Sequence, residues 1–359
     1  MDFGLTEEQV ELAGLTRKIL AGRDAPWGDL AAAGVLAAGL PAALGGAGLG
    51  LLEQCSVLIE LGRAACDVPY LASVVLGAGA LATFGTAGQR ERWAVPAGQG
   101  SAVLTAALAE EDGDDPRVPS ARAERAGGQW MLTGVKTAVD AAPEADLFLV
   151  PCATPDGVRV FLITPSDAGV SVEPQQLTDF ASAGRVVLAH VGLDDDRVLG
   201  GAEVADWLVA RATVGLCAVQ SGVIERALEL TAEYAKSRVA FGRPIGSFQA
   251  VTQRLADAYV DVEAVRLTMW QAAWLLSSCE SGDPGASGAS GVDVAVATAK
   301  FWAAEAGHRV AHTAVHVHGG LGIDVTYPVH RYFVAAKQHE FALGGATAQL
   351  RRIGDALAG

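Results

Sequence analysis

The sequence is poor in charged residues and poorest in basic ones. Charged side chains make up 19% of the 359 residues, and 41 acidic residues against 26 basic ones give a net charge of −15. Disordered chains combine low hydrophobicity with high charge, so a chain that is 51% hydrophobic is predicted to fold. A surface this acidic repels phosphate backbones and anionic lipids, and we therefore expect neither nucleic acid nor a membrane as a partner.

Several common signatures are also missing. No apolar run is long enough to span a bilayer, and the first nine residues lack the basic segment of a signal peptide, so a cytoplasmic protein is expected. The five cysteines are scattered without a CxxC pair, which argues against a zinc ribbon or a disulfide framework. No GxGxxG motif after a strand, P-loop or GxSxG elbow is present. The acidic run 110–115 is interpreted as a solvated loop.

What is present falls into three zones. Residues 1–102 have helix-like apolar spacing, residues 103–204 contain short β-rich runs separated by turns, and residues 205–359 predict long helices with narrow apolar stripes. The sequence thus predicts an α+β multidomain protein with an N-terminal helical domain, a small middle β-domain and a C-terminal domain resembling a four-helix bundle. The predicted strands are 130–133, 147–150, 158–163, 170–172 and 185–191.

The first candidate site is the segment 238–249. A predicted helix over 221–237 leads into it, and two glycines and one proline within 241–247 require a turn before Gln249 opens the next helix. Arginines beside a turn and a helix start are suited to an anionic group such as a phosphate. On spacing alone, a solvated turn whose arginines pair with nearby acids is an equal alternative.

The second candidate is the run 316–322, which follows a helix predicted from about Val292. Its glycines permit a ligand to approach the backbone closely, although a helix can simply end in the same way. His308, His312 and His316 recur four residues apart on one helical face. No cysteine or carboxylate accompanies them at a ligand-like position, so we interpret them as packing or interface residues and predict no metal site.

Taken together, these pieces resemble the acyl-CoA dehydrogenase family over nearly the whole chain. Arg238–Gln249 is similar to the family segment Arg-x-x-Phe-Gly-x-x-Ile-x-x-Phe-Gln, and His318–Gly322 with the following Tyr327-Pro-Val is similar to its Gly-Gly-x-Gly turn. Leu5–Gln9 and the stretch 40–48 match the N-terminal domain of the family. The resemblance implies a helical–β–helical subunit that forms dimers and usually dimers of dimers.

The resemblance also implies chemistry. In the family a glutamate removes the α-proton of an acyl-CoA, the β-hydride passes to FAD, and the electrons leave to an electron-transfer flavoprotein. The arginine, the phenylalanine and the glycine turn of the two motifs reach across a dimer to the neighbour's FAD, and His316 stands where a glutamine is usual. The residues that the resemblance assigns to cofactor binding are Arg238, Phe241, Phe248, Gln249, His316, Gly319 and Gly320.

The departures from the family pattern concern the chain's own active site. The position of the usual glutamate falls on Leu343 or Gly344, and an alternative base position on the helix before Arg238 falls on Ala212; none of these can accept a proton. Ala138 replaces the aromatic residue that usually backs the flavin. Residues that would serve a neighbour's flavin are kept, so the chain resembles the non-catalytic subunit of actinobacterial heteromeric acyl-CoA dehydrogenases of fatty acid or steroid degradation.

Three hypotheses follow. The first is a subunit that lacks the catalytic glutamate and completes the FAD site of a homologous catalytic partner. The second is a self-sufficient acyl-CoA dehydrogenase with a displaced base, for which Glu340 is the nearest carboxylate in sequence, although a helix places it on a different side from Leu343. The third is a cofactor-free scaffold or acyl-CoA-binding module.

Overall fold

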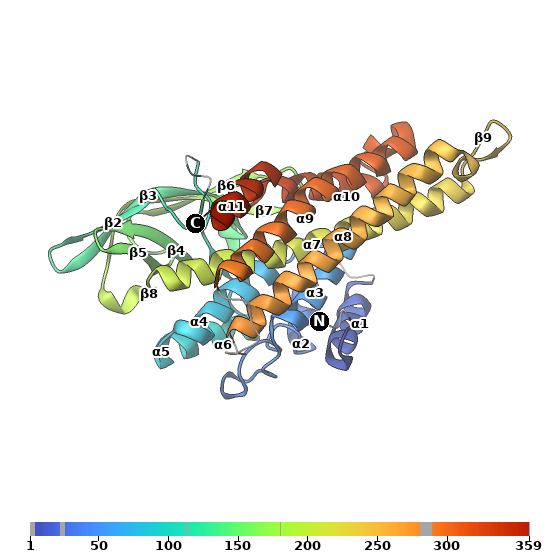
Figure 1. Cartoon of the computed structure of the whole chain (residues 1–359). Coiled ribbons are helices and arrows are strands. Elements are labelled where there is room, and N and C mark those ends of the chain that lie inside the picture. Colours follow the sequence, from blue (N-terminus) through green and yellow to red (C-terminus); the bar gives the residue numbers. More distant parts are fainter. Residues whose placement is uncertain are drawn as a thin grey trace. The chain divides into compact units, whose positions relative to one another are not determined.

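The chain folds into helices, then a sheet, then long helices (Figure 1). The computed structural model describes residues 4–21, 26–111, 113, 115–179, 181–280 and 289–358. This order of elements confirms the predicted fold class. Two compact units are present: a bundle unit of Met1–Leu20, Cys55–Cys66 and Leu216–Gly359, and a sheet unit of Ala21–Gln54 and Asp67–Gly215. The three-domain boundaries 1–102, 103–204 and 205–359 stay a prediction.

The sheet unit is built around one eight-stranded sheet. Its strand order is β6-β7-β3-β2-β4-β5-β8, and β1 pairs in parallel with β4. All five predicted strands lie within β3 to β7, whereas β1, β2 and β8 were not predicted. The bounds are β1 Leu104–Ala106, β2 Arg122–Ala126, β3 Gln129–Asp140, β4 Leu147–Thr154, β5 Gly157–Ile163, β6 Val170–Gln176, β7 Ser182–Leu193 and β8 Val198–Gly200.

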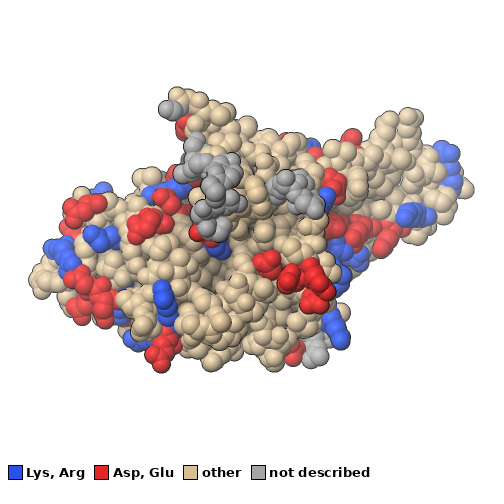
Figure 2. Space-filling view, turned by 60° about the horizontal axis from the view of Figure 1, so that its bottom comes forward, with Lys and Arg blue, Asp and Glu red and all other residues tan. Residues whose placement is uncertain are grey.

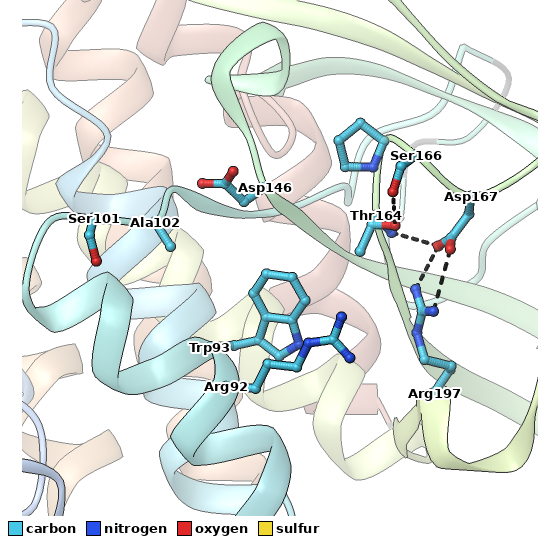
Figure 3. A pocket seen from close by; sticks show the side chains of 10 residues that line it. Arg92, Trp93, Ser101, Ala102, Asp146, Thr164, Ser166, Asp167 and Arg197 are labelled. Atoms are coloured by element: carbon cyan, nitrogen blue, oxygen red, sulfur yellow. Dashed lines mark hydrogen bonds and ion pairs between the residues drawn. The ribbon is translucent and has the colours of Figure 1, made fainter.

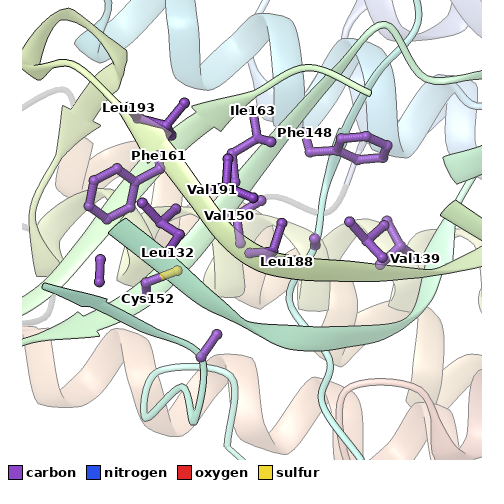
Figure 4. Packing of buried hydrophobic residues seen from close by; sticks show 14 of the residues in the cluster. Leu132, Val139, Phe148, Val150, Cys152, Phe161, Ile163, Leu188, Val191 and Leu193 are labelled. Atoms are coloured by element: carbon purple, nitrogen blue, oxygen red, sulfur yellow. The ribbon is translucent and has the colours of Figure 1, made fainter. Parts of the chain in front are cut away.

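One apolar core stabilises the sheet. Leu188 and Val191 of β7 lie three residues apart, and the β-bulge between them, where His190 has a φ of +55°, lets both join Phe148 of β4 and Phe161 of β5 in one buried cluster (Figure 4). Apart from residues 51–54 and 202–215, which begin two longer helices, the helical segments of this unit are short. They are α2 Pro26–Ala32, η1 Ala42–Leu44, η2 Tyr70–Ala78, α4 Gly79–Phe84, α5 Ala87–Gln89, η3 Arg90–Ala94, α6 Val95–Gly98, η4 Ala142–Glu144 and η5 Asp195–Arg197.

The acidic run 110–115 is not the fully solvated loop that the sequence predicted. The carboxylate of Glu110 is only 7% exposed and accepts a hydrogen bond of 2.6 Å from the fully buried ammonium of Lys136. It also accepts backbone N–H bonds from Ser120 and Ala121. The prediction was wrong for Glu110 because a cation 26 residues away is not visible in the local pattern. Asp112 and Asp114 lie outside the described residues.

Long helices make up the bundle unit, and two of them, α3 and α7, begin within the residues of the sheet unit. α8 begins at Gln249 as predicted, but α7 begins at Ala202, about 19 residues before the predicted start at 221. The prediction missed this part because it is buried on nearly all sides and therefore lacks a polar face to mark the helical period. The bounds are α1 Glu7–Leu20, α3 Leu51–Ala64, α7 Ala202–Ser237, α8 Gln249–Glu280, α9 Ala289–His318, η7 Gly319–Ile323, α10 Pro328–Phe341 and α11 Ala346–Ala358.

α7 also passes the length and hydropathy test for a membrane-spanning helix. Its most apolar window is 78% buried inside the protein, which is the arrangement of a core helix. In the bundle unit its second half contacts α9 and α10 through small side chains, and Ala227, Ala311 and Ala336 are all buried there. Small residues let helix axes approach closely.

Two glycines set the contact between α3 and α7. A Cβ built on Gly62 would lie 2.1 Å from the carbonyl oxygen of Val219, and one built on Gly222 would lie 2.0 Å from the carbonyl oxygen of Ile59. Both obstacles are backbone atoms, which cannot rotate away. The two helices therefore touch backbone to backbone.

We expect Gly222→Ala to lower the free energy of unfolding by about 1–3 kcal/mol, because the added methyl group forces the helices apart. Thermal denaturation of the full chain measures this. Gly354→Ala on α11 is the matched control: no atom lies within 4 Å of its added Cβ, and alanine is the better helix former. Equal melting temperatures for Gly222→Ala and the wild type would contradict the prediction.

Candidate functional site

The segment that follows α7 forms a tight hairpin. β9 (Val239–Ala240) pairs antiparallel with β10 (Arg243–Pro244), and the short helix η6 (Ile245–Ser247) leads into α8. The two turn residues, Phe241 and Gly242, have φ angles of +54° and +78°. Two successive positive φ angles are typical of the two-residue hairpin turn. The predicted turn is thus present, with two short strands that the sequence did not reveal.

Phe241 is the most unusual residue of this hairpin. Its side chain is 93% exposed, and its left-handed backbone costs a non-glycine residue about 1–2 kcal/mol. The Phe241 ring meets Phe248 edge-on at 6.0 Å, and the Arg243 guanidinium lies 4.3 Å from the centre of the Phe248 ring. Strain and apolar exposure at one tip point to a binding surface.

Arg238 stands at the base of the hairpin. Its backbone is fixed, since its N–H donates to the carbonyl of Tyr234 and its own carbonyl accepts from the N–H of Ile245, both at 2.8 Å. Its guanidinium is exposed and has no ion-pair or hydrogen-bond partner among the described residues. Figure 2 shows basic side chains gathered at the end of the bundle that carries this hairpin. An uncommitted guanidinium there is suited to an anion.

The glycine turn lies at the C-terminal end of α9. Gly319 has a φ of +61°, and a Cβ built on Gly319 or Gly320 would meet no atom within 4 Å. Gly322, in contrast, packs against α9, with its Cβ position 2.7 Å from the Cα of Val315. The back of the turn is therefore closed and the front is open to a close-approaching group.

The structure brings the two motifs together at one end of the bundle unit (Figure 1). His318, the last residue of α9, stacks on Tyr234 of α7 with ring centres 4.3 Å apart. Tyr234 lies four residues before Arg238, and Gly319 follows His318 directly. His316 and Gln249 are exposed near the end of α9 and the start of α8. Sequence reasoning missed the Tyr234–His318 contact, because 84 positions separate the two residues.

The position of the usual catalytic base holds no carboxylate. Leu343 and Gly344 form the turn between α10 and α11 with φ angles of +59° and +91°. The side-chain amide of Gln349 donates to both of their carbonyls, at 3.0 and 3.1 Å. The buried ammonium of Lys300 donates to the carbonyls of His339 and Glu340 in the last turn of α10. Hydrogen bonds from Gln349 and Lys300 thus hold this part of the chain in place. Neither Leu343 nor Gly344 has a side chain that can accept a proton.

Glu340, the displaced-base candidate, is engaged elsewhere. Its side chain is 14% exposed, lies 2.5 Å from the ammonium of Lys337 and 3.1 Å from Nδ1 of His308. The carboxylate is thus held by two neighbouring side chains of the bundle unit. The geometry therefore disfavours Glu340 as a catalytic base.

We expect Glu340→Gln to change the dehydrogenase rate of the assembled enzyme by less than about twofold, whereas losing a general base lowers rates by about 10²–10⁴-fold. A dye-reduction assay measures the rate. Lys337→Met, which breaks the same cluster from its other side, is the control for indirect effects. A rate that falls to background only in Glu340→Gln would make Glu340 the base.

Of His308, His312 and His316 on α9, the first two are in ring contact. The rings of His308 and His312 lie 4.3 Å apart, and His312 meets Phe333 edge-on. Burial, together with the neighbouring His308 and Lys337, lowers the pKa of His312. Within the described residues no group of three or more His, Cys, Asp or Glu side chains could hold a metal ion. The contacts fit packing residues.

In the sheet unit, the resemblance places an aromatic residue behind the flavin at position 138. The backbone there is already hydrogen-bonded within the chain. Ala138 has a φ of +48°, and its N–H donates to the side-chain carbonyl of Gln175 at 2.7 Å. The hydroxyl of Thr137 donates to the same oxygen at 3.2 Å. Nothing aromatic stands at position 138, so this strand offers neither a ring nor a vacant N–H there.

The sheet unit also contains a pocket of about 470 Å³ (Figure 3). Trp93 and Arg92 lie on one side of it and Asp146 on another. Its second arginine, Arg197, is already paired with Asp167 at 2.5 Å. None of the residues that the sequence assigned to cofactor binding lines this pocket.

The helical–β–helical order, the glycine turn and the Arg-x-x-Phe-Gly hairpin together define the subunit type of acyl-CoA dehydrogenases. The chain belongs to that family: the models of its N-terminal, middle and C-terminal domains match residues 7–101, 105–191 and 200–358. Members are FAD-dependent oxidoreductases acting on the CH–CH group of acyl-CoA thioesters. The predicted family, reaction class and cofactor are thereby confirmed.

Among curated relatives, acyl-CoA dehydrogenase FadE27 of Mycobacterium tuberculosis is 48% identical, covering 100% of this chain and 99% of the relative. Among solved structures, a chain of the ChsE4–ChsE5 complex from Mycobacterium tuberculosis matches with a TM-score of 0.91, 48% identity and coverage of 100% and 99%. A variant of the Tcur3481–Tcur3483 steroid ACAD matches with a TM-score of 0.88, 40% identity and 98% coverage of both chains.

Proposed function

We propose that this chain is the non-catalytic subunit of a heteromeric acyl-CoA dehydrogenase and completes the FAD site of a homologous catalytic partner. The main support for this proposal is the exposed hairpin. Its residue Phe241 has a strained backbone and is 93% exposed, and the side chain of Arg238 has no partner among the described residues. The relatives from the ChsE4–ChsE5 and Tcur3481–Tcur3483 complexes support a heteromeric assembly.

These residues fit a dinucleotide that is bound elsewhere and approaches the surface of this chain from outside. Arg238 supplies a charge for a diphosphate, Phe241 and Phe248 supply ring surface, and the open front of Gly319 and Gly320 lets a backbone come close. Gln249 and His316 add exposed polar groups on the neighbouring helix ends. When bound, FAD supplies the acceptor for the hydride that leaves the β-carbon of an acyl-CoA.

The reaction needs a base that this chain does not place at Leu343 or Gly344. The proton of the α-carbon is therefore removed by a carboxylate of the partner subunit. The steroid-related relative favours a steroid acyl-CoA over a simple fatty acyl-CoA as substrate. We further propose a cytoplasmic dimer or tetramer with the domains 1–102, 103–204 and 205–359, whose electrons pass to an electron-transfer flavoprotein.

The visible absorption spectrum tests this proposal. The chain purified alone is expected to take up no FAD, whereas the chain co-purified with its homologous partner is expected to show an oxidised flavin spectrum that the acyl-CoA bleaches. A flavin bound and bleached in the chain alone would instead establish a self-sufficient enzyme. Absence of flavin in every assembly would leave the scaffold hypothesis.

A further inference from the structure

His318 occupies the junction between the hairpin and the glycine turn. It is 4% exposed, stacks on Tyr234 at an interplanar angle of 23°, and meets Tyr327 with ring centres 5.4 Å apart. Tyr234 belongs to α7 and Tyr327 precedes α10. One imidazole therefore joins the ends of three elements.

Its hydrogen bonds fix which nitrogen carries the proton. Nδ1 lies 2.8 Å from the carbonyl oxygen of Ala314, and a carbonyl can only accept, so Nδ1 must donate. Nε2 is buried and has no hydrogen-bond partner among the described residues. A neutral ring leaves Nε2 as an unpaired lone pair, whereas a protonated ring would bury a charged N–H donor without an acceptor, which costs more.

The stacked ring couples the two cofactor-facing segments. The carbonyl of Tyr234 accepts the N–H of Arg238 at 2.8 Å, and His318 is bonded directly to Gly319. We propose, on the basis of the proposed function, that neutral His318 is a positioning residue that holds the hairpin and the glycine turn as one cradle, and that its protonation loosens both together.

The surroundings of the ring give the direction of the pH effect. The titratable side chains in ring contact are the phenols of Tyr234 and Tyr327, and no charged group contributes to the shift. Burial lowers the pKa of His318 below its ordinary value of 6.5, against the hydrogen bond to Ala314. The unfolded or loosened state then binds more protons, so the cradle is most stable above pH 6.5 and loses stability as the pH falls below it.

Hydrogen exchange of the full chain alone tests the coupling without any cofactor. At pH 8, the backbone amides of residues 238–248 and 319–323 should both exchange faster in His318→Ala than in the wild type. In His318→Phe, which keeps the ring stack, the amides of both segments should stay protected. His312→Phe, six residues earlier on α9, is the matched control and should change neither segment. Exchange that rises in only one of the two segments would overturn the coupling.

The affinity of the assembled enzyme for FAD tests the pH dependence. For the wild type and for His312→Phe, the Kd should rise as the pH falls from 7 to 5.5, by no more than about tenfold per unit for one proton. For His318→Phe the Kd should be nearly flat. A wild type without pH dependence, or His318→Phe with the same dependence, would overturn the inference. An assembly that binds no FAD at any pH would refute the proposed function, and the exchange experiment would still decide the role of His318.

Discussion

Replacing Arg238 by alanine is expected to raise the Kd of the assembled enzyme for FAD by about 10- to 100-fold, because one charge-assisted contact to a phosphate contributes about 1.5–3 kcal/mol. The chain itself should fold as before, since the guanidinium has no partner among the described residues that it would leave unpaired. Fluorescence of released FAD on dilution measures the affinity.

Lys236→Ala is the matched control for Arg238→Ala. Lys236 is an exposed cation two residues earlier on α7, so removing it changes the local charge equally without touching the proposed contact. Its Kd should stay within about threefold of the wild type, as expected for a screened surface charge. An unchanged affinity in Arg238→Ala, or an equal loss in both variants, would remove Arg238 from the site.

The second large effect concerns the buried pair of Glu110 and Lys136. Glu110→Ala leaves the ammonium of Lys136, which is fully buried, without its counter-ion. We expect a loss of about 3–5 kcal/mol in the free energy of unfolding, measured by chemical denaturation. The double variant Glu110→Leu with Lys136→Met should recover part of this loss, because it leaves no buried charge, whereas the backbone N–H groups of Ser120 and Ala121 still lose their acceptor. A single variant as stable as the wild type would contradict the prediction.

The same pair makes the chain sensitive to acid. Burial disfavours the charge of Glu110, yet the hydrogen bond and charge of Lys136 hold its pKa below the ordinary value of 4.5. A lowered pKa means that the stabilisation is complete above pH 4.5 and is lost as the pH falls through the pKa of the folded state.

Much of the fold could be predicted, because it rests on local patterns. The five strands between 130 and 191 are short β-rich runs separated by turn-forming stretches, and Gln249 follows a turn that glycine and proline enforce, so both were visible in the sequence. The first half of α7 was not, since a helix buried on nearly all sides shows no polar face. The prediction for Glu110 was wrong because its partner Lys136 lies on β3, 26 residues further along the chain.

The candidate site likewise has one part that the sequence predicts and another that it does not. Spacing alone could identify the hairpin and the glycine turn as unusual, and the family resemblance gave them a role. Their meeting through Tyr234 and His318 depends on how α7 and α9 pack, which no local pattern encodes. The ion pair of Glu340 with Lys337 is local to α10, but its contact with His308 depends on how α9 packs against α10.

The solvent-facing ring of Phe241 has a consequence for how the protein must be made. Phe241 is an exposed aromatic residue on a strained turn, and Val239 beside it is also exposed. Until a partner covers them, these apolar side chains promote association between chains. The chain produced alone should therefore remain soluble to a lower concentration than the chain produced together with its partner, and comparison of the two soluble fractions measures this difference.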